Sequence, residues 1–146
     1  MGSIMAAINS SDANVERLKQ LRPMLLKLHK ALLDSERIVY EREHGPIKNS
    51  GEFFRLVISH TAFDWLRPIS QFIVQIDEFL DPKEPPENPS EGAAILLEKA
   101  RLMMKPAEES ATPLGSNYFQ AIQRDPNIAL MHAEVRQVLK DRGEWA

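Results

Sequence analysis

Three side chains that can bind a metal or transfer a proton recur at intervals of seven residues: His29, Glu36 and Glu43. Seven residues make about two turns of an α-helix, so these groups lie nearly in line along one face. The surrounding helix is apolar around roughly two-thirds of its circumference, and the line falls inside that apolar arc. A buried carboxylate or imidazole is costly unless it is paired. Each of these groups therefore needs a partner or a hydrated cavity.

One partner could come from the end of the chain, where His132 projects from the inner side of the last predicted helix. This arrangement predicts a site for a metal ion or small polar ligand, with His29, Glu36 and His132 as ligands. The alternative is a structural network in which Arg22 or another arginine pairs with Glu36. The sequence favours the network, because structural ion pairs outnumber metal sites in helical bundles.

Other patterns that could carry chemistry are incomplete. Glu41 and His44 form one Glu-x-x-His unit, whereas di-iron bundles use two such units and further carboxylates. The glycines are scattered, and no serine lies in a nucleophile elbow. An enzyme that uses Glu36 and His29 as an acid–base pair is a third possibility. The sequence nevertheless favours a protein that is not an enzyme, and it predicts no cofactor.

The composition is that of an ordinary globular domain and narrows the range of partners. The chain has 146 residues, of which 43% are hydrophobic and 27% are charged, values that suit one folded domain. A net charge of −3 provides no basic surface for nucleic acid. No apolar run is long enough to cross a membrane, and no signal peptide is recognisable. We therefore expect a cytoplasmic protein, and the lack of cysteine is compatible with a reducing cytosol.

The apolar spacing predicts a long first helix. Residues at alternating steps of three and four form its core face: Leu18, Leu21, Leu25, Leu28, Leu32 and Val39. Ser35 occupies the remaining core position, and Pro23 must either kink this helix or divide it in two. The helix should end at His44-Gly45-Pro46. We expect residues 1–12 to be a flexible lead-in and residues 13–146 to form a single domain.

The remaining sequence predicts further helices joined by polar connectors. A second apolar stripe contains Phe54, Ile58, Trp65, Ile69, Phe72, Ile76 and Phe79. Pro68 should accompany a break near residues 60–67, and a proline-rich connector follows at 81–87. A third helix should start after the cap Asn88, and a last one after Asp125. The predicted fold is all-α, an antiparallel helical bundle of about four long segments.

These observations lead to two hypotheses about function. The leading one is a non-enzymatic helical protein that works through protein–protein contacts. It could form a homodimer through a second apolar face of the first helix, which is too apolar for a simple surface helix. The alternative is the interior site for a metal or small polar ligand at His29, Glu36 and His132. Trp145, near the C-terminus, could also lie in an interface.

Overall fold

The computed structural model describes residues 2–140, with side chains from residue 13 onward, and within that range the chain is all-α. The elements are α1 (Gly2–His44), α2 (Ser50–Ser59), a 3-10 helix η1 (Thr61–Leu66), α3 (Arg67–Leu80), α4 (Pro89–Met103), α5 (Pro113–Arg124) and α6 (Pro126–Leu139). The predicted fold class is confirmed. Gly143 and Trp145 lie outside the described residues.

Helix α1 is continuous through Pro23, so the prediction of one long helix holds and that of two short ones does not. The helix also begins at Gly2, and no boundary appears near residue 12 where we expected the lead-in to end. This difference has a local reason, since Met5, Ala6 and Ala7 are strong helix formers. The other end is as predicted, with Gly45 at a φ of 85° directly after His44.

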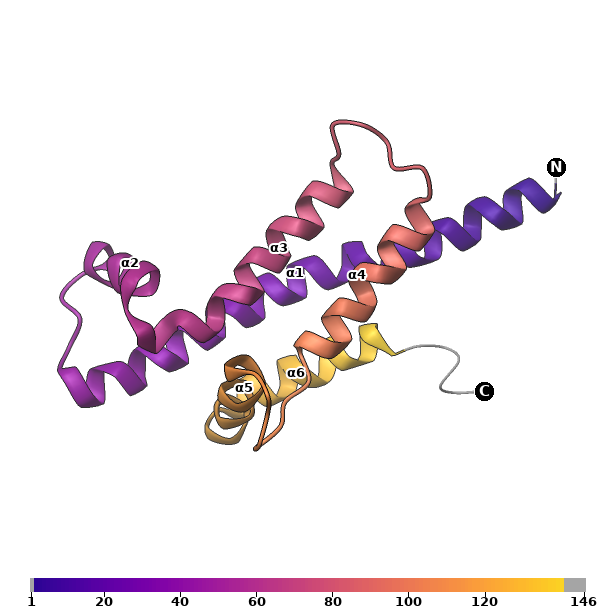
Figure 1. Cartoon of the computed structure of the whole chain (residues 1–146). Helices are drawn as coiled ribbons and strands as arrows, with labels where there is room; N and C mark the ends of the chain where they lie inside the picture. The colour runs from indigo at the N-terminus through magenta and orange to yellow at the C-terminus, as the bar shows by residue number, and fades with distance from the viewer. Residues whose placement is uncertain (1, 141–146) are drawn as a thin grey trace.

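The long helices alternate in direction around α1. Figure 1 shows α3 running back against α1, α4 running against α3, and α6 running against α4. Helix α1 packs against α3, α4 and α6 and is therefore central, which explains its wide apolar arc. Its core residues are fully buried: Leu18, Leu21, Leu25, Leu28 and Leu32. These leucines meet α3 through Ile69, Phe72 and Ile76 and form one continuous core with the other helices.

The predicted break before Pro68 is present, and it divides the second apolar stripe. His60 ends α2 and caps η1, because its Nδ1 accepts a hydrogen bond from the Ala62 N–H at 3.0 Å. Trp65 and the α3 members of the stripe face the core, whereas Phe54 and Ile58 of α2 are exposed. Placing Phe54 and Ile58 with the core stripe was therefore wrong. The break resets the helical phase, and α2 packs inward through Phe53, Leu56 and Val57 instead.

Side-chain caps begin each of the last three helices. Asn88 accepts from the Glu91 N–H as predicted, Thr112 from the Gly115 N–H, and Asp125 from the Asn127 N–H. A proline follows each cap and favours the first helical turn. Helix α5 consequently starts at Pro113. The connector at 81–88 is exposed throughout.

Within the described residues, no helix is both long enough and apolar enough to cross a lipid bilayer.

Candidate functional site

The α1 line of His29, Glu36 and Glu43 does not form one site. Glu36 pairs with Arg124 of α5, whose Nη2 lies 2.8 Å from a carboxylate oxygen, and the Glu36 side chain is only 12% exposed. The same guanidinium donates from Nε to the buried Ser35 hydroxyl at 2.8 Å. The polar network that we predicted as the alternative to a metal site is therefore present, and Arg124 is the arginine that pairs with Glu36. Glu43 is exposed in the last turn of α1.

Arg22 has a different partner from the one suggested by the sequence. Its guanidinium pairs with Asp77 of α3, where both side chains are partly exposed. The electrostatic link between α1 and α3 is thus separate from the link between α1 and α5. Each connects the central helix to one of its neighbours.

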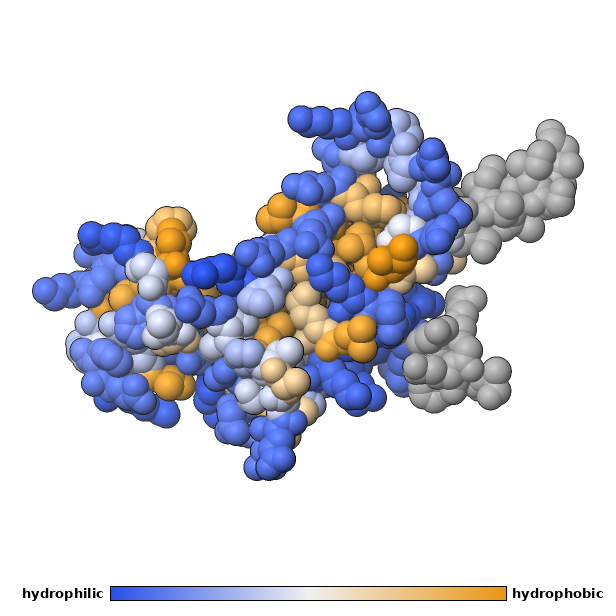
Figure 2. All heavy atoms as spheres, viewed as in Figure 1, coloured by the Kyte–Doolittle hydropathy of each residue, from blue (hydrophilic) through white to orange (hydrophobic). Residues whose placement is uncertain are grey.

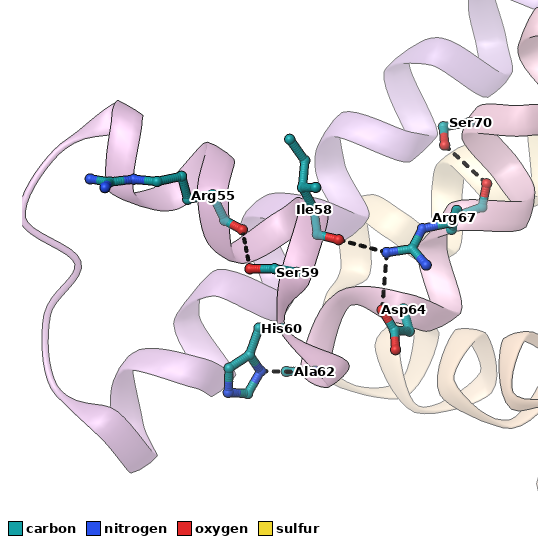
Figure 3. A network of polar contacts seen from close by, with 8 residues as sticks. All are labelled: Arg55, Ile58, Ser59, His60, Ala62, Asp64, Arg67 and Ser70. Atoms are coloured by element: carbon teal, nitrogen blue, oxygen red, sulfur yellow. Dashed lines mark hydrogen bonds and ion pairs between the residues drawn. The ribbon is translucent and has the colours of Figure 1, made fainter.

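His29 is half-buried beside a hollow of about 370 Å³ at the junction of α1, α2 and η1. The hollow is mainly apolar, with Val57, Phe63 and Leu66 in its lining. Burial lowers the pKa of His29, because the apolar surroundings disfavour the charged imidazolium. Arg67, which also lines the hollow, is already engaged: Figure 3 shows its guanidinium bound to the Ile58 carbonyl at 2.8 Å and to Asp64 at 3.2 Å.

His132 holds α6 to α5. Its Nδ1 lies 2.7 Å from the hydroxyl of Tyr118, a residue that is fully buried in the core. Burial raises the pKa of Tyr118, so the phenol stays protonated and available to the imidazole. The pKa of His132 is lowered, first by burial and then by the nearby positive charge of Arg136. Tyr118 is buried, whereas His132 is half-buried and lines a neighbouring hollow, so this hydrogen bond joins α5 to α6 at the edge of the core.

A basic hollow of about 400 Å³ adjoins His132 and is lined by Arg101, Lys105, Arg136 and Lys140. Arg101 lies in the last turn of α4, and Arg136 lies in the last turn of α6. Basic residues are favourable at such positions because they face the negative ends of the helix dipoles. Helix termination therefore accounts for this positive charge without a bound anion.

The predicted metal ligands are not brought together. Among the residues that the structure describes, no three His, Cys, Asp or Glu side chains are placed to hold a metal ion.

An aromatic cluster at the end of α1 was not predicted from the sequence. Tyr40 stacks on His44 with ring centroids 4.4 Å apart, and His60 meets both rings edge-on.

An apolar groove of about 630 Å³ runs along α4. Its apolar lining comes from the start of α3, from α4 and from the start of α5: Pro68, Ile95, Leu102, Met103 and Leu114. Glu98 and Lys99 are its charged members. We call this surface the α4 groove. Figure 2 shows hydrophobic residues gathered over α3 and α4 on the face that contains it.

Helix α4 is apolar on two opposite faces, and this produces the groove. Its inner face packs on the core through Ala93, Leu97 and Ala100. Ile95 and Leu102 lie about 180° around the helix from that face. They are 62% and 69% exposed, although side chains of this size are usually buried. A helix that is apolar on both sides normally has something packed on each side.

The sequence does contain the signal for this surface. Ile95 and Leu102 are seven residues apart and fall between the residues of the inner stripe, so a helical projection of 89–103 separates the two faces. We predicted a second apolar face on the first helix instead, because that helix is the more apolar. The structure covers most of the α1 arc with α3, α4 and α6.

No family model, no curated protein and no solved structure matches this chain, so these comparisons supply no function.

Proposed function

We propose that this chain is a protein-interaction module that binds an apolar helical segment in the α4 groove. The observation that carries the proposal is the exposure of Ile95 and Leu102 on the outer face of α4, beside a hollow large enough for side chains. Two large hydrophobic residues one heptad apart match the i and i+7 anchors of an amphipathic helix. Contiguous exposed apolar patches on a protein surface commonly mark interaction sites.

The polar groups support an interaction protein over an enzyme. Glu36, the proposed acid or base, is held by Arg124 and is largely covered. His132 is bound to a buried tyrosine. Both groups contribute to the packing of α5, and neither lies at the α4 groove. We further propose a cytoplasmic location, with which the lack of cysteine is compatible because disulfides are rare in that compartment.

A selection experiment tests the proposal. A displayed library of amphipathic helical peptides would be selected on the immobilised full chain, and the selected peptides would then be measured against Leu102→Glu. We expect Leu102→Glu to weaken binding at least tenfold, because it places a charge in the apolar groove, an effect of about 1.4 kcal/mol or more.

The matched control is Leu130→Glu on α6, which changes a leucine of similar exposure (65%) outside the groove. This variant should bind the peptides as the unmodified chain does. Circular dichroism should show that both variants are as helical as the unmodified chain, since both sites are on the surface. Selected peptides that bind both variants equally well would overturn the proposal.

A further inference from the structure

We propose that the occupant of the α4 groove is a second copy of this chain, bound through α4 in antiparallel orientation. The inference rests on the proposed function, because it names the partner of the same surface. It follows from four α4 residues that share the outer face: Ile95, Glu98, Lys99 and Leu102, at positions i, i+3, i+4 and i+7.

This set of residues is self-complementary about its own centre. A two-fold axis between positions 98 and 99 places Ile95 opposite the partner's Leu102, because both lie 3.5 residues from the axis. The same axis places Glu98 opposite the partner's Lys99, so a carboxylate meets an ammonium group. By symmetry each contact occurs twice, as in isologous dimers. A parallel pair would instead place Glu98 against Glu98 and Lys99 against Lys99.

The present partners of the two charged residues do not oppose this pairing. Glu98 accepts from Arg101 at 3.0 Å, and Lys99 donates to Gln75 at 2.7 Å and lies over the Phe72 ring, 5.6 Å from its centroid, all on the same chain. The two hydrogen bonds are exposed, and exposed contacts of this kind contribute little to stability. Each charged group can therefore turn to a new partner at small cost.

The exposed apolar residues on α1 form no comparable surface for a second copy. Leu26 and Ile38 are exposed on α1, but twelve residues separate them, which places them about 120° apart around the helix. The groove between α1 and α6 is lined by Asp34, Asp125 and Glu134. Two copies joined through that groove would bring like charges together, whereas the α4 groove pairs opposite charges.

Charge reversal provides the main test, with self-association of the full chain measured by sedimentation over a range of concentrations. We expect the unmodified chain to dimerise. Glu98→Lys and Lys99→Glu should each weaken the dimer about tenfold or more, because each change creates two like-charge contacts across the axis. The double variant Glu98→Lys/Lys99→Glu should restore dimerisation, since the pairs are merely exchanged.

Mixing the two single variants gives a stricter result. Glu98→Lys carries two positive charges at these positions and Lys99→Glu carries two negative charges, so a heterodimer should form although each homodimer is weakened. An effect that came only from the lost contacts with Arg101 or Gln75 would not be rescued by mixing.

Cysteine pairs test the orientation, and the chain has no cysteine that would interfere. Ile95→Cys mixed with Leu102→Cys should give a disulfide-linked heterodimer under mild oxidation. Ile95→Cys alone should crosslink poorly, because the two copies of position 95 would be offset by about 10 Å along the helices, beyond disulfide reach. Preferential crosslinking of Ile95→Cys to itself would overturn the antiparallel arrangement.

A mass of one chain at every concentration would overturn the inference, as would a dimer that ignores both charge reversals. Either result is distinguishable from failure of the proposed function. If the chain is monomeric but peptides selected on it lose binding to Leu102→Glu, the groove is a docking site for another partner. If those peptides also bind Leu102→Glu unchanged, both proposals fall.

Discussion

Ser35 and Glu36 bind a side chain that lies nearly ninety residues further along the chain. Ser35 takes a core position of α1 that the heptad pattern would give to an apolar residue, and it is buried. The Arg124 guanidinium donates to its hydroxyl and to the Glu36 carboxylate, so two polar groups share one partner. This one guanidinium therefore fixes the position of α5 against α1.

Replacing Arg124 should therefore destabilise the fold. Arg124→Met leaves the Ser35 hydroxyl and a largely covered carboxylate without their donor, and we expect a loss of about 1–3 kcal/mol in the free energy of unfolding. The control is Lys30→Met, which breaks the exposed pair of Lys30 with Asp34 on the same helix and should cost under about 0.5 kcal/mol. Urea unfolding measures the free energy of unfolding of both variants. Equal losses would show that the Arg124 network stabilises the fold no more than an exposed ion pair does.

His132 should make stability depend on pH. Because burial and Arg136 lower its pKa below the ordinary value of 6.5, the unfolded chain binds more protons than the folded chain in mildly acidic solution. Stability due to this group is complete above pH 6.5 and decreases as the pH falls through that value towards the lower pKa of the folded chain. His29, whose pKa is also lowered, should act in the same direction.

The variant His132→Asn checks this expectation, since an asparagine can still accept a hydrogen bond from Tyr118 but does not titrate. Its urea midpoint should decrease less than that of the unmodified chain between pH 7.5 and pH 5.5. His29→Gln should show a similar reduction, and the double variant a larger one. Identical pH profiles for the double variant and the unmodified chain would contradict the prediction.

At this scale the sequence could identify the unusual residues but not their partners. Placing Glu36 and His132 in an apolar arc requires only helical spacing, and both are indeed covered or half-buried. Selecting Arg124 over Arg22 as the partner requires the packing of α5, which depends on tertiary contacts that no local pattern contains. The same limit left Tyr118 unrecognised as the partner of His132.

At the scale of elements, Pro23 is the most unusual feature, because it lies inside a continuous helix. A proline there lacks the N–H that would bond to the carbonyl of Lys19, and its ring crowds that carbonyl. The spacing of apolar residues continues through Pro23 without a change of phase, and the leucines on both sides are fully buried. Core packing therefore outweighs the local preference of proline.

Removing this proline should stabilise the chain. We expect Pro23→Ala to raise the free energy of unfolding by about 1–3 kcal/mol, the gain in the helix being partly offset by a more flexible unfolded chain. The control Pro68→Ala, in the first turn of α3, should give no gain, since proline is favourable there. Thermal unfolding compares the two, and destabilisation by Pro23→Ala would mean that the proline has a packing role.

Helix boundaries were predicted correctly where the local sequence signals are strong. Helix ends with a cap and a proline, as at Asn88 and Asp125, were predicted from sequence because the interactions that make them are local. The start of α5 has the same signal, Thr112-Pro113, in a less apolar setting. Assigning Phe54 and Ile58 to the second stripe was wrong because a period of 3.6 residues does not continue across a 3-10 segment.

At the scale of the whole molecule, buried apolar surface is unevenly distributed among the helices. The core is continuous over α1, α3, α4, α5 and α6, whereas α2 contains no buried residue and packs on the core only through half-buried side chains. Segments with little buried apolar surface open locally at lower free energy than the rest of a domain. Helix α2 should therefore be the weakest of the helices for which side chains are described.

Hydrogen exchange measures this difference directly. Backbone amides in α2 should exchange about tenfold faster or more than those in α3 and in the 18–32 part of α1, at a pH where all are stable. The exposed Phe54→Ser change in α2 should leave the slow amides of α1 unaffected, because the two regions open independently. Uniform exchange across all these helices would show that the chain opens only as one unit.

The two-sided composition of α4 separates folding from association. Its fully buried residues are two alanines and one leucine, while its large exposed groups, Ile95 and Leu102, contribute little to the folded monomer. Substitutions on the outer face should therefore leave the thermal stability of the monomer unchanged and register only in assays that vary the protein concentration. Such a surface can gain or lose partners during evolution while every intermediate sequence still folds.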